Sequence, residues 1–214
     1  MKPFRDRVDA GRALARALAH HGGADTLVLG LPRGGVPVAY EVARALDAEL
    51  DVVVVRKLGV PFQPELAMGA VASGGALARN EDVIRLAGVS EAQFERVRAS
   101  EEAELRRREA LFRGRRPAPR VAGRVVIVVD DGLATGASML AALAALRSLK
   151  PARLVAAVPV APPDAAARLA GADEFVCLDA PAGFAAVGQF YQDFGQTSDE
   201  DVRALLRRAH RVAA

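Results

Sequence analysis

The chain has 214 residues, of which 51% are hydrophobic and 26% charged. This length is enough for one well-buried domain with a subdomain and is short for two full domains. The net charge of +3 is too small to indicate a nucleic-acid partner, and we expect none. The N-terminus has no apolar leader and no run approaches the length of a membrane span, which predicts a cytoplasmic protein without a membrane partner.

The first predicted element is an amphipathic helix over residues 4–19, whose charged residues we interpret as a solvated face. His20 and His21 follow it directly. They do not combine with His210 or with the single cysteine, Cys177, at a spacing typical of metal ligands. We therefore interpret Cys177 as a small buried apolar residue, and expect no metal motif among these four residues.

A short apolar run over residues 26–31 (TLVLGL) predicts a buried strand. The loop PRGG follows it, and residues 36–46 then predict a helix. Paired glycines, Gly34 and Gly35, allow the backbone to approach an anion closely, and Arg33 can supply positive charge. The loop is therefore a candidate anion site at a strand-to-helix connection.

Residues 51–55 (DVVVV) predict a third strand, which ends in Arg56 and Lys57. At the carboxyl edge of a parallel sheet, these two cations would face the same crevice as the loop before them. A solvated strand end is the alternative interpretation. Residues 58–64 contain two prolines and a glycine, which predicts a loop.

Residues 66–73 predict a short strand, and residues 90–113 predict one long polar helix with Ser90 as its N-cap. The apolar stripe of this helix is thin, and three consecutive arginines lie on it at 106–108. A peripheral helix or a dimer-forming helix fits this pattern.

The most informative stretch begins with the run VVIVV at 125–129, which predicts a strand buried on both faces. Two carboxylates, Asp130 and Asp131, follow it. Next comes a loop of small and hydroxylated residues that leads into a helix: Ala134, Thr135, Gly136, Ala137 and Ser138. Backbone N–H groups of such a loop and the helix N-terminus can bind a phosphate, although neither the P-loop nor the Rossmann pattern is present. Because carboxylates would repel the phosphate itself, sugar hydroxyls or Mg²⁺ are their expected partners, which indicates a phosphorylated ribose.

The rest of the chain predicts a strand at 153–160, a short helix at 164–170, a strand at 174–178 and a last helix capped by Ser198. Aromatic residues gather at 184–194, where they suit either stacking on a flat ligand or a small satellite core. Strands alternate with helices throughout. This alternation predicts an α/β fold with a doubly wound parallel sheet, whose anion loops share the carboxyl edge.

An apolar strand followed by DDxxxTGxS resembles the signature of the type I phosphoribosyltransferases, which bind 5-phosphoribosyl 1-diphosphate (PRPP). The resemblance covers about residues 26–160. It implies that Asp130 and Asp131 contact the ribose and act in catalysis, and that residues 134–138 bind the 5′-phosphate. It also implies a diphosphate site made by Arg33, Gly34, Gly35, Arg56 and Lys57.

The resemblance implies displacement of diphosphate from ribose C1 by a nitrogen nucleophile, such as a nucleobase, with Mg²⁺ as cofactor and a homodimer as the assembly. It implies no direct protein ligand to the metal. Hypoxanthine-guanine-type enzymes carry an aspartate where this chain has Ala134, which disfavours a 6-oxopurine acceptor. A non-catalytic PRPP-binding regulator is the alternative, although no helix-turn-helix or basic arm is visible. An enzyme acting on another phosphosugar is a further alternative.

We therefore expect one phosphoribosyltransferase-like domain over residues 1–214, with a core at about 24–160. A helical insertion at about 74–120 takes the place of the family's mobile lid. The segment 161–214 would contribute a small hood subdomain that combines its aromatic residues with an N-terminal portion of the chain.

Overall fold

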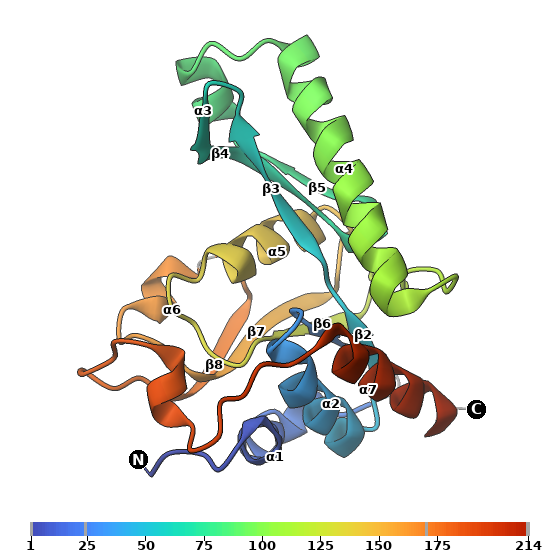
Figure 1. Ribbon diagram of the computed structural model, residues 1–214, viewed down its shortest axis with the longest axis vertical. Coiled ribbons are helices and arrows are strands. Elements are labelled where there is room, and N and C mark those ends of the chain that lie inside the picture. Colours follow the sequence, from blue (N-terminus) through green and yellow to red (C-terminus); the bar gives the residue numbers. More distant parts are fainter. Residues whose placement is uncertain (1, 24, 170, 213–214) are drawn as a thin grey trace.

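The computed structural model describes residues 2–23, 25–169 and 171–212. Its centre is a five-stranded parallel sheet with the strand order β2-β1-β6-β7-β8 (Figure 1). The strands are β1 (Thr26–Gly30), β2 (Glu49–Val52), β6 (Val125–Val129), β7 (Arg153–Val160) and β8 (Glu174–Asp179). Among the described residues, no helix combines the length and the apolar character needed to cross a membrane.

Helices cover both faces of this sheet, which confirms the doubly wound architecture. In β6, Ile127 and Val129 pack into one core cluster, whereas Val126 and Val128 pack into another on the opposite face. The first face carries α1 (Arg7–Ala17), α2 (Gly35–Leu46) and α7 (Asp199–Val212), and the second carries α5 (Ala137–Arg147) and α6 (Ala165–Arg168). The uninterrupted apolar run of β6 follows from this burial on both faces.

The strand order places a topological switch point between β1 and β6. The chain moves outward from β1 to β2 and later returns to the other side of β1 as β6, where Gly30 pairs in register with Val129. Loops that leave two such strands turn to opposite faces, so a crevice opens between them at the carboxyl edge. The two predicted anion loops lie at this switch point.

A second unit projects from one side of the parallel sheet (Figure 1). It contains a three-stranded antiparallel sheet and two helices: β3 (Val55–Val60), β4 (Gln63–Ala72), β5 (Ala76–Arg79), α3 (Glu81–Leu86) and α4 (Glu91–Arg113). The remaining elements are short 3₁₀ turns: η1 (Ala19–His21), η2 (Ser73–Gly75) and η3 (Val187–Phe190). The antiparallel sheet packs on α5 through β4 and β5.

Helix α4 begins where the sequence indicates and ends in the core. Ser90 and Gln93 form a capping box, in which each side chain accepts from the other residue's backbone N–H. At the other end, the buried guanidinium of Arg113 donates to Asp51 at 2.9 Å and to the carbonyl of Val52 at 2.5 Å. Removing one partner of such a buried pair costs about 3–5 kcal/mol, so the end of α4 is firmly anchored to β2.

Two local predictions are wrong. The strand expected at 51–55 ends at Val52, and Arg56 and Lys57 lie in β3 of the antiparallel sheet. The loop expected at 58–64 is mostly strand. The register shifts around Gly59, where a Cβ would lie 2.3 Å from the carbonyl oxygen of Pro64, so this bulge accommodates the glycine and proline that suggested a loop.

The outer boundaries of the expected core and insertion also differ. The sequence predicts a core that ends at residue 160, but β8 pairs with β7 and forms the edge of the parallel sheet. It predicts an insertion that begins at residue 74, whereas the antiparallel unit begins at Val55. Both differences arise because strand pairing joins segments that the local pattern does not connect.

Candidate active site

The PRGG loop and the acidic pair lie in close contact at the switch point. A Cβ at Gly34 would lie 2.1 Å from Asp131 Oδ2, and one at Gly35 would lie 2.6 Å from the carbonyl oxygen of Val129. Only glycine fits at these two positions without displacing the second loop. The structure therefore brings two of the predicted site segments together, and the paired glycines make this approach possible.

A cleft of about 690 Å³ opens beside the two loops. Three of the predicted site residues line it: Arg33, Asp130 and Ser138. The side chain of Arg33 is half exposed and lies 3.7 Å from Asp199 Oδ1, an ion pair that is weak because solvent screens it. Arg33 is therefore free to turn towards an anion in the cleft.

The loop that leads into α5 has the geometry of an anion cradle. Gly136 is the N-cap of α5 and adopts the left-handed conformation with φ 74°, and it has no side chain that could cap the helix. The N–H groups of the first helical turn other than that of Ala137 therefore remain available to an anion. Ala134, Thr135 and Ser138 are exposed beside them. Thr135 Oγ1 accepts from the N–H of Ala137 at 3.4 Å, which orders the loop.

Asp130 lines the cleft, and its carboxylate contacts the backbone of the next residue. Its Oδ1 accepts from the N–H of Asp131 at 2.9 Å. Burial, and then the negative charge of Asp131, raise the pKa of Asp130 well above its ordinary value. A hydroxyl group or a cationic ligand in the cleft would relieve this unfavourable charge.

Asp131 is held by an arginine from the N-terminal helix. Arg7 Nε donates to Asp131 Oδ2 at 2.8 Å, and Arg7 Nη1 donates to the carbonyl of Gly195 at 2.6 Å. The guanidinium also stacks on Phe194, with its Cζ 4.1 Å from the ring centroid. Tyr191 Oη donates to the carbonyl of Asp131 at 2.6 Å. Burial, with the charge of Asp131 second, raises the pKa of Tyr191, so this phenol stays protonated as a donor.

The aromatic segment at 184–194 packs against the N-terminus and is joined to it by backbone hydrogen bonds. The N–H of Phe4 donates to the carbonyl of Phe190 at 2.8 Å, and the N–H of Gln192 donates to the carbonyl of Phe4 at 2.8 Å. Phe4, Ala10 and Tyr191 form a separate small hydrophobic cluster. The segment is therefore a satellite core that also fixes Arg7 beside Asp131.

The two predicted cations after β2 lie away from the 690 Å³ cleft. Arg56 donates to Glu101 of α4 at 2.7 Å, which ties β3 to that helix. Lys57 is exposed and lines a second groove of about 760 Å³, between α5 and the antiparallel sheet, together with Ala137 of the cradle. Neither Arg56 nor Lys57 is among the described residues that line the 690 Å³ cleft.

Two arginines that sequence reasoning did not assign to the site do line the cleft. Arg107 and Arg108 come from the last turns of α4, and both pair with Glu104, at 2.8 and 2.9 Å. These exposed pairs are weak, so both guanidinium groups can reach an anion. The run of three consecutive arginines at 106–108 was the one feature of the sequence that could have indicated an anion-binding role for this part of α4. Their position over the carboxyl edge depends on the anchor between Arg113 and Asp51, which the sequence does not indicate.

The residues at the cleft fit Mg²⁺ only as an ion that arrives with a substrate. Asp131 already forms an ion pair with Arg7 at 2.8 Å. Asp130, which accepts only from a backbone N–H, is therefore the carboxylate of the pair that a metal ion could approach. Among the described residues, the one cluster of three metal-ligating side chains lies elsewhere. Mg²⁺ commonly binds through one or two carboxylates together with substrate phosphates, and this donor set is compatible with that mode.

Comparisons with known proteins show which family this chain resembles. A family model described as "Phosphoribosyl transferase domain" matches residues 5–182. Two curated Mycobacterium tuberculosis proteins, from strains CDC 1551 / Oshkosh and ATCC 25618 / H37Rv and each named "Putative phosphoribosyl transferase", are 53% identical to this chain over 212 residues. These matches cover 99% of this chain and 48% of each relative, so the chain spans about half the length of the curated relatives it matches.

A solved structure extends the comparison to three dimensions. The crystal structure of TT1426 from Thermus thermophilus is 50% identical to this chain, with a TM-score of 0.87. The match covers 97% of this chain and 99% of the other. Both the parallel sheet and the projecting antiparallel unit thus fall within the matched region. Because the family model covers most of the chain, this protein belongs to the phosphoribosyl transferase domain family.

Proposed function

We propose that the protein transfers the 5-phosphoribosyl group of PRPP to a nitrogen nucleophile and releases diphosphate. The observation that carries this proposal is one cleft beside the two anion loops, which is lined by Asp130, Ser138 and the arginines Arg33, Arg107 and Arg108. The transition state of such a displacement resembles an oxocarbenium ion, while negative charge grows on the leaving diphosphate. Carboxylates beside the ribose and guanidinium groups beside the diphosphate both lower the barrier.

The proposed roles follow the position of each segment. The 5′-phosphate occupies the cradle at 134–138, because its free helical N–H groups and hydroxyls suit a phosphate dianion. Asp130 and Asp131 accept from the ribose hydroxyls. The diphosphate lies against Arg33, Gly34 and Gly35. The family resemblance also implies Arg56 and Lys57, but neither lines the cleft, so we leave them out of the proposed diphosphate site. When bound, Mg²⁺ neutralises part of the diphosphate charge.

We add Arg107 and Arg108 to the diphosphate site. Both line the cleft together with Arg33 of the PRGG loop, and neither is buried. They would approach the leaving group from above the carboxyl edge and exclude water from it. Because α4 is anchored through Arg113, we propose that the arginine side chains move rather than the whole helix.

The acceptor is proposed to be a nucleobase or a related flat nitrogen compound. Phe194 is 38% exposed and lies next to Arg7 at the hood, so an aromatic surface is available near Asp131. Stacking on an aromatic ring suits a planar acceptor. The presence of Ala134 before Thr135 disfavours a 6-oxopurine for the reason given by the family pattern.

The test is an assay of diphosphate release from PRPP with Mg²⁺ across a panel of purines, pyrimidines and related bases. We expect release with at least one acceptor, together with a product whose mass equals that of the phosphoribosylated base. Release without such a product would indicate hydrolysis and contradict the transfer. Binding of PRPP without any release would support the non-catalytic regulator instead, and no interaction at all would favour an enzyme that acts on another phosphosugar.

We also propose a homodimer. Four large apolar side chains are exposed on the projecting unit: Phe62 (66%), Leu66 (38%), Leu86 (82%) and Leu111 (40%). Where such side chains gather into one contiguous patch, they mark an interaction surface, and the proposal requires that they do so here. Light scattering on the purified protein would measure the mass, and a monomer at all concentrations would contradict this assembly.

A further inference from the structure

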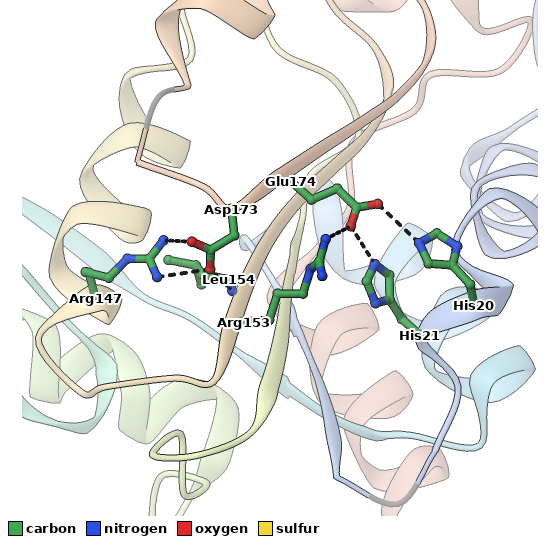
Figure 2. A network of polar contacts seen from close by, with 7 residues as sticks. All are labelled: His20, His21, Arg147, Arg153, Leu154, Asp173 and Glu174. Atoms are coloured by element: carbon green, nitrogen blue, oxygen red, sulfur yellow. Dashed lines mark hydrogen bonds and ion pairs between the residues drawn. The ribbon is translucent and has the colours of Figure 1, made fainter.

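Figure 2 shows two histidines and a glutamate that converge near the amino ends of the parallel strands. His20 and His21 lie in η1, just before β1, and Glu174 is the first residue of β8. The acidic pair instead follows the last residue of β6. A strand rises about 3.3 Å per residue, so the length of the strands separates this cluster from the cleft. The cluster is therefore not part of the cleft.

The side chains of the cluster point towards one centre. His20 Nε2 lies 3.2 Å from Glu174 Oε1, and His21 Nε2 lies 3.1 Å from Glu174 Oε2. The three ligand atoms all lie within 4.8 Å of one another. Zinc binds imidazole nitrogen and carboxylate oxygen at about 2.0–2.2 Å, which places tetrahedral ligands roughly 3.3 Å apart. Only small side-chain rotations separate the observed geometry from that arrangement.

The burial of the three side chains suits an ion that keeps one solvent ligand. The side chains of His21, Glu174 and His20 are 7%, 22% and 58% exposed, so one side of the cluster is closed and the other is open. An ion can therefore enter past His20 and meet preformed ligands behind it.

A neighbouring arginine competes for the same carboxylate. Arg153 Nη2 donates to Glu174 Oε2 at 2.9 Å, and its side chain is 50% exposed (Figure 2). A cation bound at Oε2 would displace this guanidinium into solvent. The adjacent carboxylate is no substitute, because Asp173 accepts from Arg147 at 2.9 Å and from the N–H of Leu154 at 2.7 Å.

We propose that His20, His21 and Glu174 bind one Zn²⁺ ion, with solvent as the fourth ligand. The set of two histidines and one carboxylate is one that zinc uses with an open position. The ion would link the end of the N-terminal helix region to the edge strand β8. Because zinc would bind the folded state and not the dispersed ligands of the unfolded chain, it would also raise the melting temperature.

The test is a titration of the metal-free protein, without a histidine tag, with zinc chloride in competition with a chromophoric chelator. We expect one ion per chain. His20→Ala and Glu174→Gln should each weaken binding by about tenfold or more. His210→Ala is the matched control, since His210 lies on α7 and contacts the carbonyl of Leu206, and it should leave the affinity unchanged. Arg153→Gln should tighten binding, because it removes the competing cation.

Substitution with Co²⁺ gives a second readout, since a tetrahedral site produces visible absorption that His20→Ala should abolish. His20 is exposed, so this variant is expected to fold even if a change at buried His21 does not. Zinc affinity that is equal in the parent and in His20→Ala would overturn the proposal. Failure of the parent to bind zinc would do the same. Neither result would affect the proposed transferase activity, because the cluster lies near the amino ends of the parallel strands and is not part of the cleft.

Discussion

Arg7 and Asp131 form an ion pair at 2.8 Å although they lie 124 residues apart in the sequence. Their side chains are 13% and 15% exposed. The pair joins the N-terminal helix to the acidic motif that follows β6. It fixes the carboxylate of Asp131 next to Asp130, which lines the cleft and has no such cation within hydrogen-bonding distance among its described contacts. The two adjacent aspartates therefore have different electrostatic surroundings.

Replacing Arg7 by Met should destabilise the protein and disturb the site together. The change leaves a largely buried carboxylate without its charged donor, which costs about 2 kcal/mol in the free energy of unfolding. Arg7→Lys keeps the charge but loses the planar stacking on Phe194. Its loss of unfolding free energy should therefore be smaller than that of Arg7→Met. Urea denaturation measures the free energy of unfolding of both variants. Arg16→Met, an exposed change on the same helix, is the control, and equal losses in Arg7→Met and Arg16→Met would contradict the role of the pair.

Asp130→Asn should stabilise the protein at neutral pH. The folded-state pKa of Asp130 is raised, so the unfolded chain releases this proton at lower pH than the folded protein does. The free energy of unfolding of the parent therefore falls as pH rises from the ordinary carboxyl pKa through the raised one, by about 1.4 kcal/mol for each unit of difference. Asparagine has no such proton, and its oxygen can still accept from the N–H of Asp131.

The measurement is the melting temperature of both proteins from acid to mildly alkaline pH, without ligands. The two curves should meet at acid pH and separate as the pH rises, with Asp130→Asn the more stable. Parallel curves would show that Asp130 titrates as an ordinary carboxyl group.

Changing both aspartates to asparagine should affect turnover far more than affinity. The double variant keeps hydrogen-bonding capacity but removes the negative charge that faces a cationic transition state. We expect the dissociation constant of PRPP to change by less than about tenfold, while turnover falls by about a hundredfold or more. Calorimetry and diphosphate release measure the two quantities. Unchanged turnover would remove both aspartates from the mechanism.

Gly34→Ala should weaken PRPP binding without unfolding the domain. The new methyl group would lie 2.1 Å from Asp131 Oδ2, so either the carboxylate or the PRGG loop must move. Such overpacking costs about 1–3 kcal/mol, and it acts where the two anion loops meet. Gly183→Ala is the control, because a Cβ there meets no atom within 4 Å. If both alanine variants bound PRPP equally well, the contact between the two loops would be irrelevant to the ligand.

The sequence was informative where function depends on local order along the chain. The run at 125–129, the acidic pair and the cradle are consecutive, so strand, loop and helix could be predicted from one pattern. The PRGG loop was predicted in the same way. The predicted element boundaries were wrong at Val52 and around Gly59, where pairing with another strand overrides the local propensity.

Contacts between distant segments could not be predicted from this single sequence. The pair of Arg113 with Asp51 turns α4 so that its arginines reach the cleft, and no local pattern indicates it. The same holds for Glu174, which lies 154 residues from His20 and completes a cluster that neither histidine indicates alone. Such contacts depend on how the whole chain packs, and the hydrophobic periodicity of a segment does not determine which partner it meets.

Binding of PRPP at the cradle is tested most sharply by calorimetric titration in the presence of Mg²⁺, with the parent protein and Thr135→Glu. Thr135 is exposed in the cradle, so glutamate there adds a negative charge against the 5′-phosphate without disturbing the core. We predict binding of one PRPP per chain to the parent and a loss of affinity of about tenfold or more in the variant. No binding of PRPP to the folded parent at about millimolar concentration, or equal affinity in both proteins, would contradict the proposed site.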